Sequence, residues 1–194
     1  TGQIFGEATA IDENTATSLF DGILGLAYPA LSSMGVNPPF VNMINQGVVD
    51  QPIFAFYLNK VNDSAEGELV LGGVNPNHFT GSITYTPVVQ TNYWLINIAG
   101  MYLGSAAVAP PAMAVPDSGT SLLYGPTEYM NQVNRAIGGL NESGIYIVDC
   151  AAIGSMPNVS FVINNRFFVL HPEDYILRVE FSGDVVCIST FMGS

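Results

Sequence analysis

Short apolar runs, each closed by a glycine, proline or asparagine, follow one another along this chain and restrict the folds that it can form. Hydrophobic residues make up 48% of the sequence and charged residues only 10%, and 20 glycines and 12 prolines are dispersed through it. This composition suits many short strands joined by turns rather than charged amphipathic helices. The chain is therefore predicted to be all-β.

Strands are expected where an apolar run is bounded by turn residues. They are predicted at residues 53–58, 68–71, 82–89, 93–101, 145–148, 159–163 and 166–170. Two segments instead predict helices. The first runs from Pro39 to Gln46, with Gly47 as its stop signal. The second runs from Thr127 to Ile137, with Thr127 as its cap and glycines after its end.

The length of 194 residues allows one large or two small domains with a substantial core. No apolar run of about 18 residues occurs, so no membrane span is predicted. The first residues, Thr1 to Gln3, do not form a basic and then apolar leader, so we expect them to begin a mature or internal segment.

The charge balance is strongly acidic. The sequence has four basic and sixteen acidic residues, for a formal net charge of -12. Such a surface is a poor partner for nucleic acid. In strong acid the carboxylates are neutralised, and 4 Lys and Arg with 2 His leave a charge of 4 + 2, or about +6, which limits self-repulsion. The composition therefore tolerates acid, although other acidic soluble proteins share it.

Two cysteines and three glycosylation sequons carry information about the compartment. Cys150 and Cys187 belong to no CxxC motif and no histidine cluster, which argues against a metal site. A disulfide is favoured, with two free buried cysteines as the alternative. Asn-X-Ser sequons at Asn62, Asn141 and Asn158 are consistent with the secretory pathway.

The most informative motif lies at residues 115–124. Asp117 follows an uncharged approach from Pro110 to Pro116 and is succeeded by Ser118, Gly119, Thr120 and Ser121. A carboxylate on a glycine turn among hydroxyls is arranged to be held by hydrogen bonds rather than solvated. The alternative is an ordinary Asx or Ser turn that caps a helix.

Asp-Ser-Gly-Thr after an apolar approach resembles the active-site motif of pepsin-like aspartic proteases. Further segments resemble this family in its own order, over essentially the whole chain. They are residues 20–29, 54–58, 67–74, 93–94, 125–127, 137–138, 150, 156–159, 175–177 and 187–189. The resemblance implies an all-β, bilobal fold, with residues 1–77 as the rear of the first lobe and the inter-lobe strands, and residues 78–194 as most of the second lobe.

The resemblance also implies a chemistry. Asp117 would be the second of two catalytic aspartates in an acid endopeptidase that acts through an activated water. Ser118, Gly119, Thr120 and Ser121 would form the loop that braces it, and Thr120 and Ser121 would also contact substrate. Phe20, Ile23 and Tyr93 would line the peptide cleft, with core packing as the alternative for the first two.

The same resemblance implies the partners and the setting. Peptide or protein substrates and pepstatin-type inhibitors would bind, with no cofactor, metal, nucleic acid or membrane. Cys150 and Cys187 match the disulfide of the second lobe. The location would be the secretory pathway, leading outside the cell or to a lysosome or digestive vacuole.

Three departures from the family pattern leave rivals open. Pro116 stands where an aliphatic residue is usual, and it removes a donor from a strand that is normally central. The first aspartate is expected N-terminal to Thr1, and the apolar-apolar-Gly strand beneath Asp117 is expected beyond Ser194, so activity of this chain alone is doubtful. The rivals are a catalytically inactive homologue that acts as a binding protein and an unrelated lectin-like β-sandwich.

Overall fold

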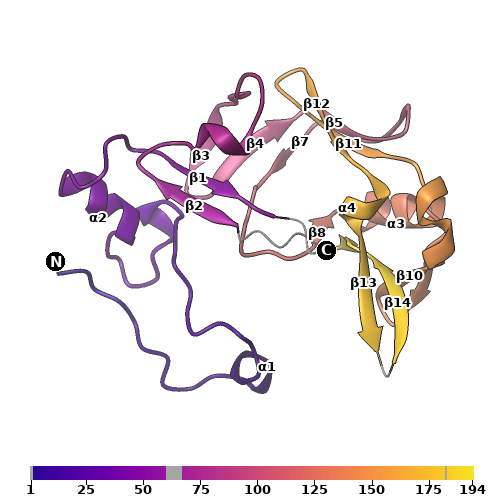
Figure 1. Ribbon diagram of the computed structural model, residues 1–194, viewed down its shortest axis with the longest axis horizontal. Coiled ribbons are helices and arrows are strands. Elements are labelled where there is room, and N and C mark those ends of the chain that lie inside the picture. The colour runs from indigo at the N-terminus through magenta and orange to yellow at the C-terminus, as the bar shows by residue number, and fades with distance from the viewer. Residues whose placement is uncertain (1, 60–66, 182) are drawn as a thin grey trace. The chain divides into compact units, whose positions relative to one another are not determined.

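The computed structural model describes residues 2–59, 67–181 and 183–194. The chain divides into two compact units, one of residues 1–83 with 91–93 and the other of residues 84–90 with 94–194 (Figure 1). Most regular structure is strand, as predicted for an all-β chain. The lobe boundary after residue 77 stays a prediction, because compactness alone does not define lobes.

In its described residues, the first unit contains one antiparallel strand pair and short helices. Strand β1 pairs with β2 in a register that places Phe54 opposite Leu71. Phe40 is buried, and its ring meets that of Phe54 edge to face at a centroid distance of 5.2 Å. The elements are α1 (Glu13–Ala16), η1 (Pro29–Leu31), α2 (Pro39–Asn45), β1 (Phe54–Tyr57), β2 (Glu68–Leu71) and η2 (Pro76–His78).

Over the part of the chain that the structure describes, the second unit, together with β3, holds four sheets. Two sheets have four strands, in the orders β13-β14-β10-β9 and β12-β11-β5-β6; β3-β4-β7 has three, and β15-β8 is a parallel pair. The strands are β3 (Val88–Thr91), β4 (Trp94–Ile98), β5 (Gly100–Leu103), β6 (Ala106–Ala109), β7 (Ala112–Ala114), β8 (Leu123–Gly125), β9 (Leu140–Glu142), β10 (Ile145–Val148), β11 (Val159–Ile163), β12 (Arg166–Leu170), β13 (Ile176–Phe181), β14 (Asp184–Ser189) and β15 (Phe191–Gly193). The helices are α3 (Thr127–Ala136), η3 (Cys150–Ser155) and α4 (Pro172–Tyr175).

Most predicted elements are present. The strands at residues 68–71, 145–148, 159–163 and 166–170 have the predicted bounds, and the strand predicted at 53–58 is one residue shorter at each end. Helix α2 ends at Asn45, just before the glycine that was predicted to stop it, and Gly47 has a φ of 64°. Helix α3 likewise ends before Gly138, whose φ is 79°.

Three predictions are wrong in detail. Strand is found from Val88 onward and not over residues 82–87, where Pro87 has no N–H for a ladder. Residues 93–101 form two strands because β4 pairs with β7 whereas β5 pairs with β11 and β6, so the chain changes sheet near Ala99. The cap position of α3 is Pro126, which makes no side-chain hydrogen bond, and Thr127 is the first helical residue.

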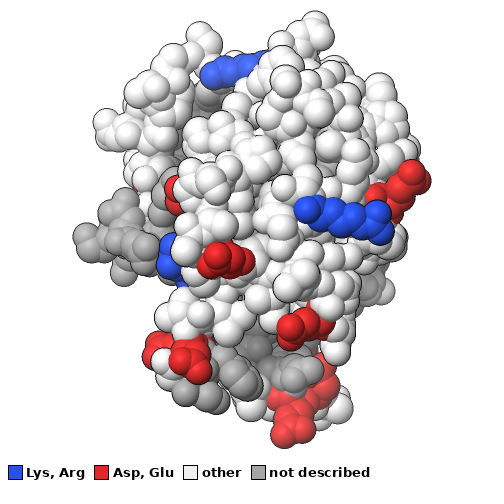
Figure 2. All heavy atoms as spheres, turned by 90° about the vertical axis from the view of Figure 1, so that its right-hand side faces the viewer, with Lys and Arg blue, Asp and Glu red and all other residues white. Residues whose placement is uncertain are grey.

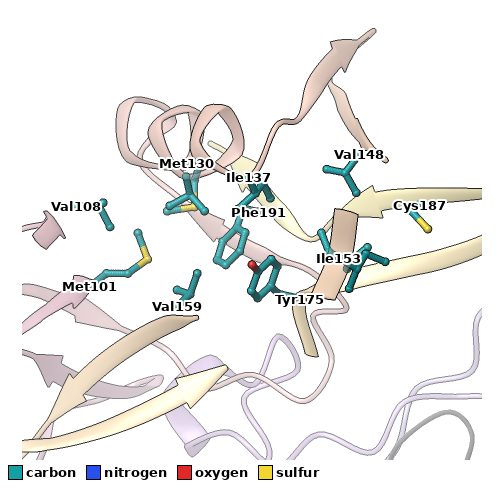
Figure 3. Close-up of a cluster of buried hydrophobic side chains, with 12 residues drawn as sticks. Met101, Val108, Met130, Ile137, Val148, Ile153, Val159, Tyr175, Cys187 and Phe191 are labelled. Atoms are coloured by element: carbon teal, nitrogen blue, oxygen red, sulfur yellow. The ribbon is translucent and has the colours of Figure 1, made fainter. Parts of the chain in front are cut away.

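The core of the second unit forms around the rings of Tyr175 and Phe191, which are fully buried with centroids 5.4 Å apart. Met130 of α3 and Ile137, which directly follows that helix, point toward Phe191 (Figure 3). The Tyr175 hydroxyl donates to the Pro157 carbonyl at 2.7 Å, so its polar end is satisfied. Burial, with a smaller contribution from Glu173, raises the pKa of Tyr175 to about 12.

The predicted disulfide is confirmed. Cys150 and Cys187 are bonded, with their Cα atoms 5.4 Å apart. Cys187 lies opposite Val148 in the β10–β14 ladder, so the bond ties the start of η3 to a central strand of its sheet.

We expect the double substitution of Cys150→Ser and Cys187→Ser to lower the free energy of unfolding by roughly 3 to 4 kcal/mol, because the bond closes a long loop in the unfolded chain. Urea unfolding of the purified protein measures the loss. A non-reduced digest of the wild type should contain the two cysteine peptides joined. Alkylation of both cysteines without reduction would contradict the bond.

Candidate active site

Asp117 lies on an exposed turn between β7 and β8. Strand β7 ends at Ala114, so Pro116 lies outside the described strand and removes no ladder donor there, contrary to the sequence-based expectation. The turn leads into β8 and not into a helix, since α3 begins only at Thr127. The helix-capping alternative is therefore wrong, although the Asx turn itself is present.

Two donors hold the Asp117 carboxylate. The backbone N–H of Gly119 donates to Oδ1 at 2.9 Å, and the Thr120 hydroxyl donates to Oδ2 in a short hydrogen bond. The Thr120 N–H also donates to the Asp117 carbonyl at 3.3 Å, which closes the turn. Both hydrogen bonds lower the pKa of Asp117 from its usual range, and the bond from the Thr120 hydroxyl has the larger effect. The turn thus stabilises an ionised, oriented and accessible carboxylate.

The turn is anchored on its C-terminal side by the β8–β15 pair. Leu123 lies opposite Phe191 and Gly125 opposite Gly193 in a parallel register. The Leu123 N–H donates to the Thr190 carbonyl at 2.9 Å, immediately before the pair begins. Residues 191–193, which form β15, are Phe-Met-Gly, and the separate apolar-apolar-Gly strand that the family resemblance implies beyond Ser194 stays a prediction.

The remaining residues predicted for the loop and the cleft are exposed. Ser118 and Ser121 flank the two residues that bond the carboxylate. Phe20, Ile23 and Tyr93 are 54%, 90% and 49% exposed, so the first two are not core residues in the structure. All three belong to the first unit, whereas Asp117 belongs to the second. A single cleft that joins them stays a prediction.

The glycosylation candidates differ in their surroundings. Asn141 is exposed beside the β9–β10 turn, and its Oδ1 accepts from the Gly144 N–H at 3.1 Å. Asn158 is exposed too, but its Oδ1 lies 3.1 Å from Nδ1 of His171, and Ser160 of its sequon is buried. Asn62 lies outside the described residues. Glycosylation of any of them stays a prediction.

Residues 2–59, 67–181 and 183–194, which the structure describes, lack two kinds of feature. No group of three or more His, Cys, Asp or Glu side chains there could hold a metal ion. No helix in the same residues is long and apolar enough to cross a bilayer. Figure 2 shows one face of the molecule, on which the charged side chains are separated by wide uncharged areas.

The residues that bond to the strands next to the Asp117 turn were not predicted from the sequence. Thr190 and Phe191 accept hydrogen bonds through their carbonyls, and Asn134 of α3 is the donor to Phe191. A polar residue among the apolar positions Met130, Val133 and Ile137 of the helix predicted at residues 127–137 is the signal that could have found Asn134.

The whole chain, residues 1–194, matches the family described as eukaryotic aspartyl protease. It is 41% identical over 99% of its length to cathepsin E of Mus musculus, of which it covers 49%. It is 37% identical over 98% of its length to cathepsin D of Homo sapiens, of which it covers 48%. It is 39% identical over 98% of its length to the probable vacuolar protease A of Arthroderma benhamiae, of which it also covers 48%.

The chain therefore belongs to the eukaryotic aspartyl protease family, as the motif around Asp117 implied. It spans about half the length of the curated relatives that it matches.

We expect Thr120→Val to raise the pKa of Asp117, because it removes the donor with the largest effect on that pKa. Thr120→Ser keeps a hydroxyl and should leave the pKa near its wild-type position. Carbon-detected NMR titration of the Asp117 carboxyl measures both.

The sign of the accompanying stability change follows from the lowered pKa. The two hydrogen bonds to the Asp117 carboxylate stabilise the folded state at pH values above the usual pKa of a carboxyl group. That contribution is lost as the pH falls through the lowered pKa of Asp117. Thr120→Val should therefore be less stable than Thr120→Ser above that range, and the two should converge in stronger acid. An unchanged Asp117 pKa in Thr120→Val would remove the hydroxyl from this role.

Proposed function

We propose that this chain supplies the second catalytic aspartate, Asp117, of an aspartic endopeptidase that hydrolyses peptide bonds of protein substrates at acidic pH. The observation that carries the proposal is the Asp117 turn, in which the Thr120 hydroxyl and the Gly119 amide orient an exposed carboxylate in a chain of this family. Relatives named cathepsin E and cathepsin D support the same reaction class.

The proposed mechanism uses two carboxylates that share one proton. Two like charges held close together cannot both ionise, so one carboxylate is a base while the other is an acid. The base takes a proton from a water molecule as that water attacks the peptide carbonyl, and the acid protonates the developing oxyanion. The other aspartate belongs to the part of the protein expected to precede Thr1, which is the partner that Asp117 requires.

The residues around Asp117 have supporting roles in this proposal. Gly119 and Thr120 fix the direction of the carboxylate, and Ser118 and Ser121 extend the hydroxyl-rich loop toward the backbone of an extended peptide. Phe20, Ile23 and Tyr93 would form the apolar side of the cleft, which their exposure allows. Pepstatin-type inhibitors would occupy the same cleft.

We place the enzyme in an acidic compartment of the secretory pathway or outside the cell. The disulfide indicates an oxidising environment during folding. One relative is named as a vacuolar protease. The excess of sixteen acidic over four basic residues limits charge repulsion at low pH.

Asp117→Asn in the full-length protein should reduce turnover of denatured globin by ~10³-fold or more, because an amide keeps the shape but cannot share the proton of the pair. Circular dichroism should show an unchanged fold. Asp184→Asn, at an exposed position of a hairpin, is the matched control and should retain full activity.

Two results of that experiment exclude the proposal. Retention of more than about a tenth of the activity in folded Asp117→Asn would remove Asp117 from the mechanism. Absence of any pepstatin-sensitive cleavage by the wild type would favour the inactive homologue that acts as a binding protein.

The activity should rise as the solution becomes acidic and disappear near neutrality, because the reaction requires the singly protonated pair. The rate of peptide cleavage measured against pH tests this. A flat profile between about pH 4 and 8, where ordinary carboxyls have lost their protons, would contradict the mechanism.

A further inference from the structure

Asn134 is a polar residue in the core of the second unit. Its exposed fraction is 0%, and Met130 and Val133 of the same helix, with Ile137 just after its end, are buried apolar residues. A buried amide costs free energy unless its donors and acceptor are paired. Asn134 therefore needs a hydrogen bond to compensate for its burial, whereas an apolar residue at the same position would need none.

The amide of Asn134 is only partly paired. Its Nδ2 donates to the carbonyl of Phe191 at 2.9 Å. Its Oδ1 is buried and has no hydrogen-bond partner among the residues that the structure describes. The side chain is thus oriented by a single strong contact, and that contact is to the backbone of β15.

Strand β15 is the partner of the strand that follows the Asp117 turn. The parallel β8–β15 pair is only three residues long, which gives it few hydrogen bonds of its own. Because the two strands are paired, a shift of β15 moves β8. Leu122 and Ser121 connect β8 directly to Thr120, whose hydroxyl donates to the Asp117 carboxylate.

Close packing of α3 on this pair makes the contact sensitive to small shifts. A Cβ added at Gly193 would lie 2.8 Å from Oγ1 of Thr127, and one added at Gly125 would lie 2.9 Å from Cε of Met130. The helix therefore lies directly on both strands. These glycines set the distance between the helix and the two strands. The hydrogen bond from Asn134 to Phe191 then fixes the position of β15 along the helix axis.

We propose that Asn134 is a positioning residue for the catalytic turn: through Phe191 and the β8–β15 pair it sets the place of Thr120 relative to Asp117. The inference rests on the proposed function for its catalytic consequence. Asn134 touches neither the carboxylate nor the substrate, so it is not a catalytic residue.

The test compares Asn134→Leu with Asn134→Asp in the full-length protein. Leucine has a similar volume but no donor, so kcat for a peptide substrate should fall by ~10-fold or more while KM changes by less than about 3-fold. The pKa of Asp117, followed by NMR, should rise in this variant because the Thr120 hydroxyl is displaced.

Asn134→Asp provides a conditional rescue. A buried carboxyl stays protonated in acid, and its O–H can donate to the Phe191 carbonyl as the amide does. The kcat ratio of Asn134→Asp to wild type should therefore be near one at the acid end of the profile and fall as the pH rises. If Asn134→Leu does not fold, this pH-dependent ratio alone decides the proposal.

Asn131→Leu is the matched control on the same helix. It removes the 2.7 Å bond from the Tyr146 hydroxyl to Asn131 Oδ1, which lies toward β10 and not toward β15. It should lower thermal stability while leaving kcat and the Asp117 pKa unchanged.

The outcomes separate this inference from the proposed function. Loss of stability in Asn134→Leu with unchanged kcat and unchanged Asp117 pKa would overturn the positioning role. A constant kcat ratio for Asn134→Asp across the pH profile would do the same. If the wild type proves inactive, the Asp117 pKa still reports the positioning: a rise in Asn134→Leu supports it and an unchanged value refutes it.

Discussion

Helix α3 can lie against the β8–β15 pair only because both strands have glycine where the helix approaches most closely. Gly125 and Gly193 lie opposite each other in the parallel register, and a Cβ on either would come within 3 Å of a side-chain atom of the helix. This packing encloses Phe191, the central ring of the core, and fixes the strand on which the Asp117 turn depends. The exposed turn is thus directly connected to a strand that packs on the buried core.

The chain orients its carboxylate by hydrogen bonding and not by burial. Burial alone would raise the pKa of Asp117 and favour its neutral form, whereas the Thr120 hydroxyl and Gly119 amide lower that pKa. In the proposed function Asp117 must remain open to substrate, and donors within its own turn orient the carboxylate without covering it. The cost of this solution is dependence on the exact backbone course between Asp117 and β8.

The elements that the sequence predicts well are those whose signals are local. Residues 145–148 and 166–170 are apolar runs closed by turn residues, and both strands have the predicted bounds. The strand predicted at 82–89 was mostly wrong because pairing depends on a distant partner, which a local pattern does not contain. Asp117 could be found from its motif and family resemblance. Asn134 could not, because its partner Phe191 is 57 positions away and contributes only a backbone carbonyl.

The acidic composition and the lowered pKa of Asp117 act together. In strong acid, protonation removes carboxylate charge, and four basic residues with two histidines leave only a modest positive charge. Asp117 keeps its charge to a lower pH, because its two donors favour the ionised form. Asp117 therefore stays ionised at a pH where a carboxyl of ordinary pKa is neutral, as does Glu68, whose pKa is lowered by its hydrogen bonds to Asn75 and His78. A carboxylate in that state can share a proton with a neutral partner, which is the condition that a two-aspartate mechanism requires.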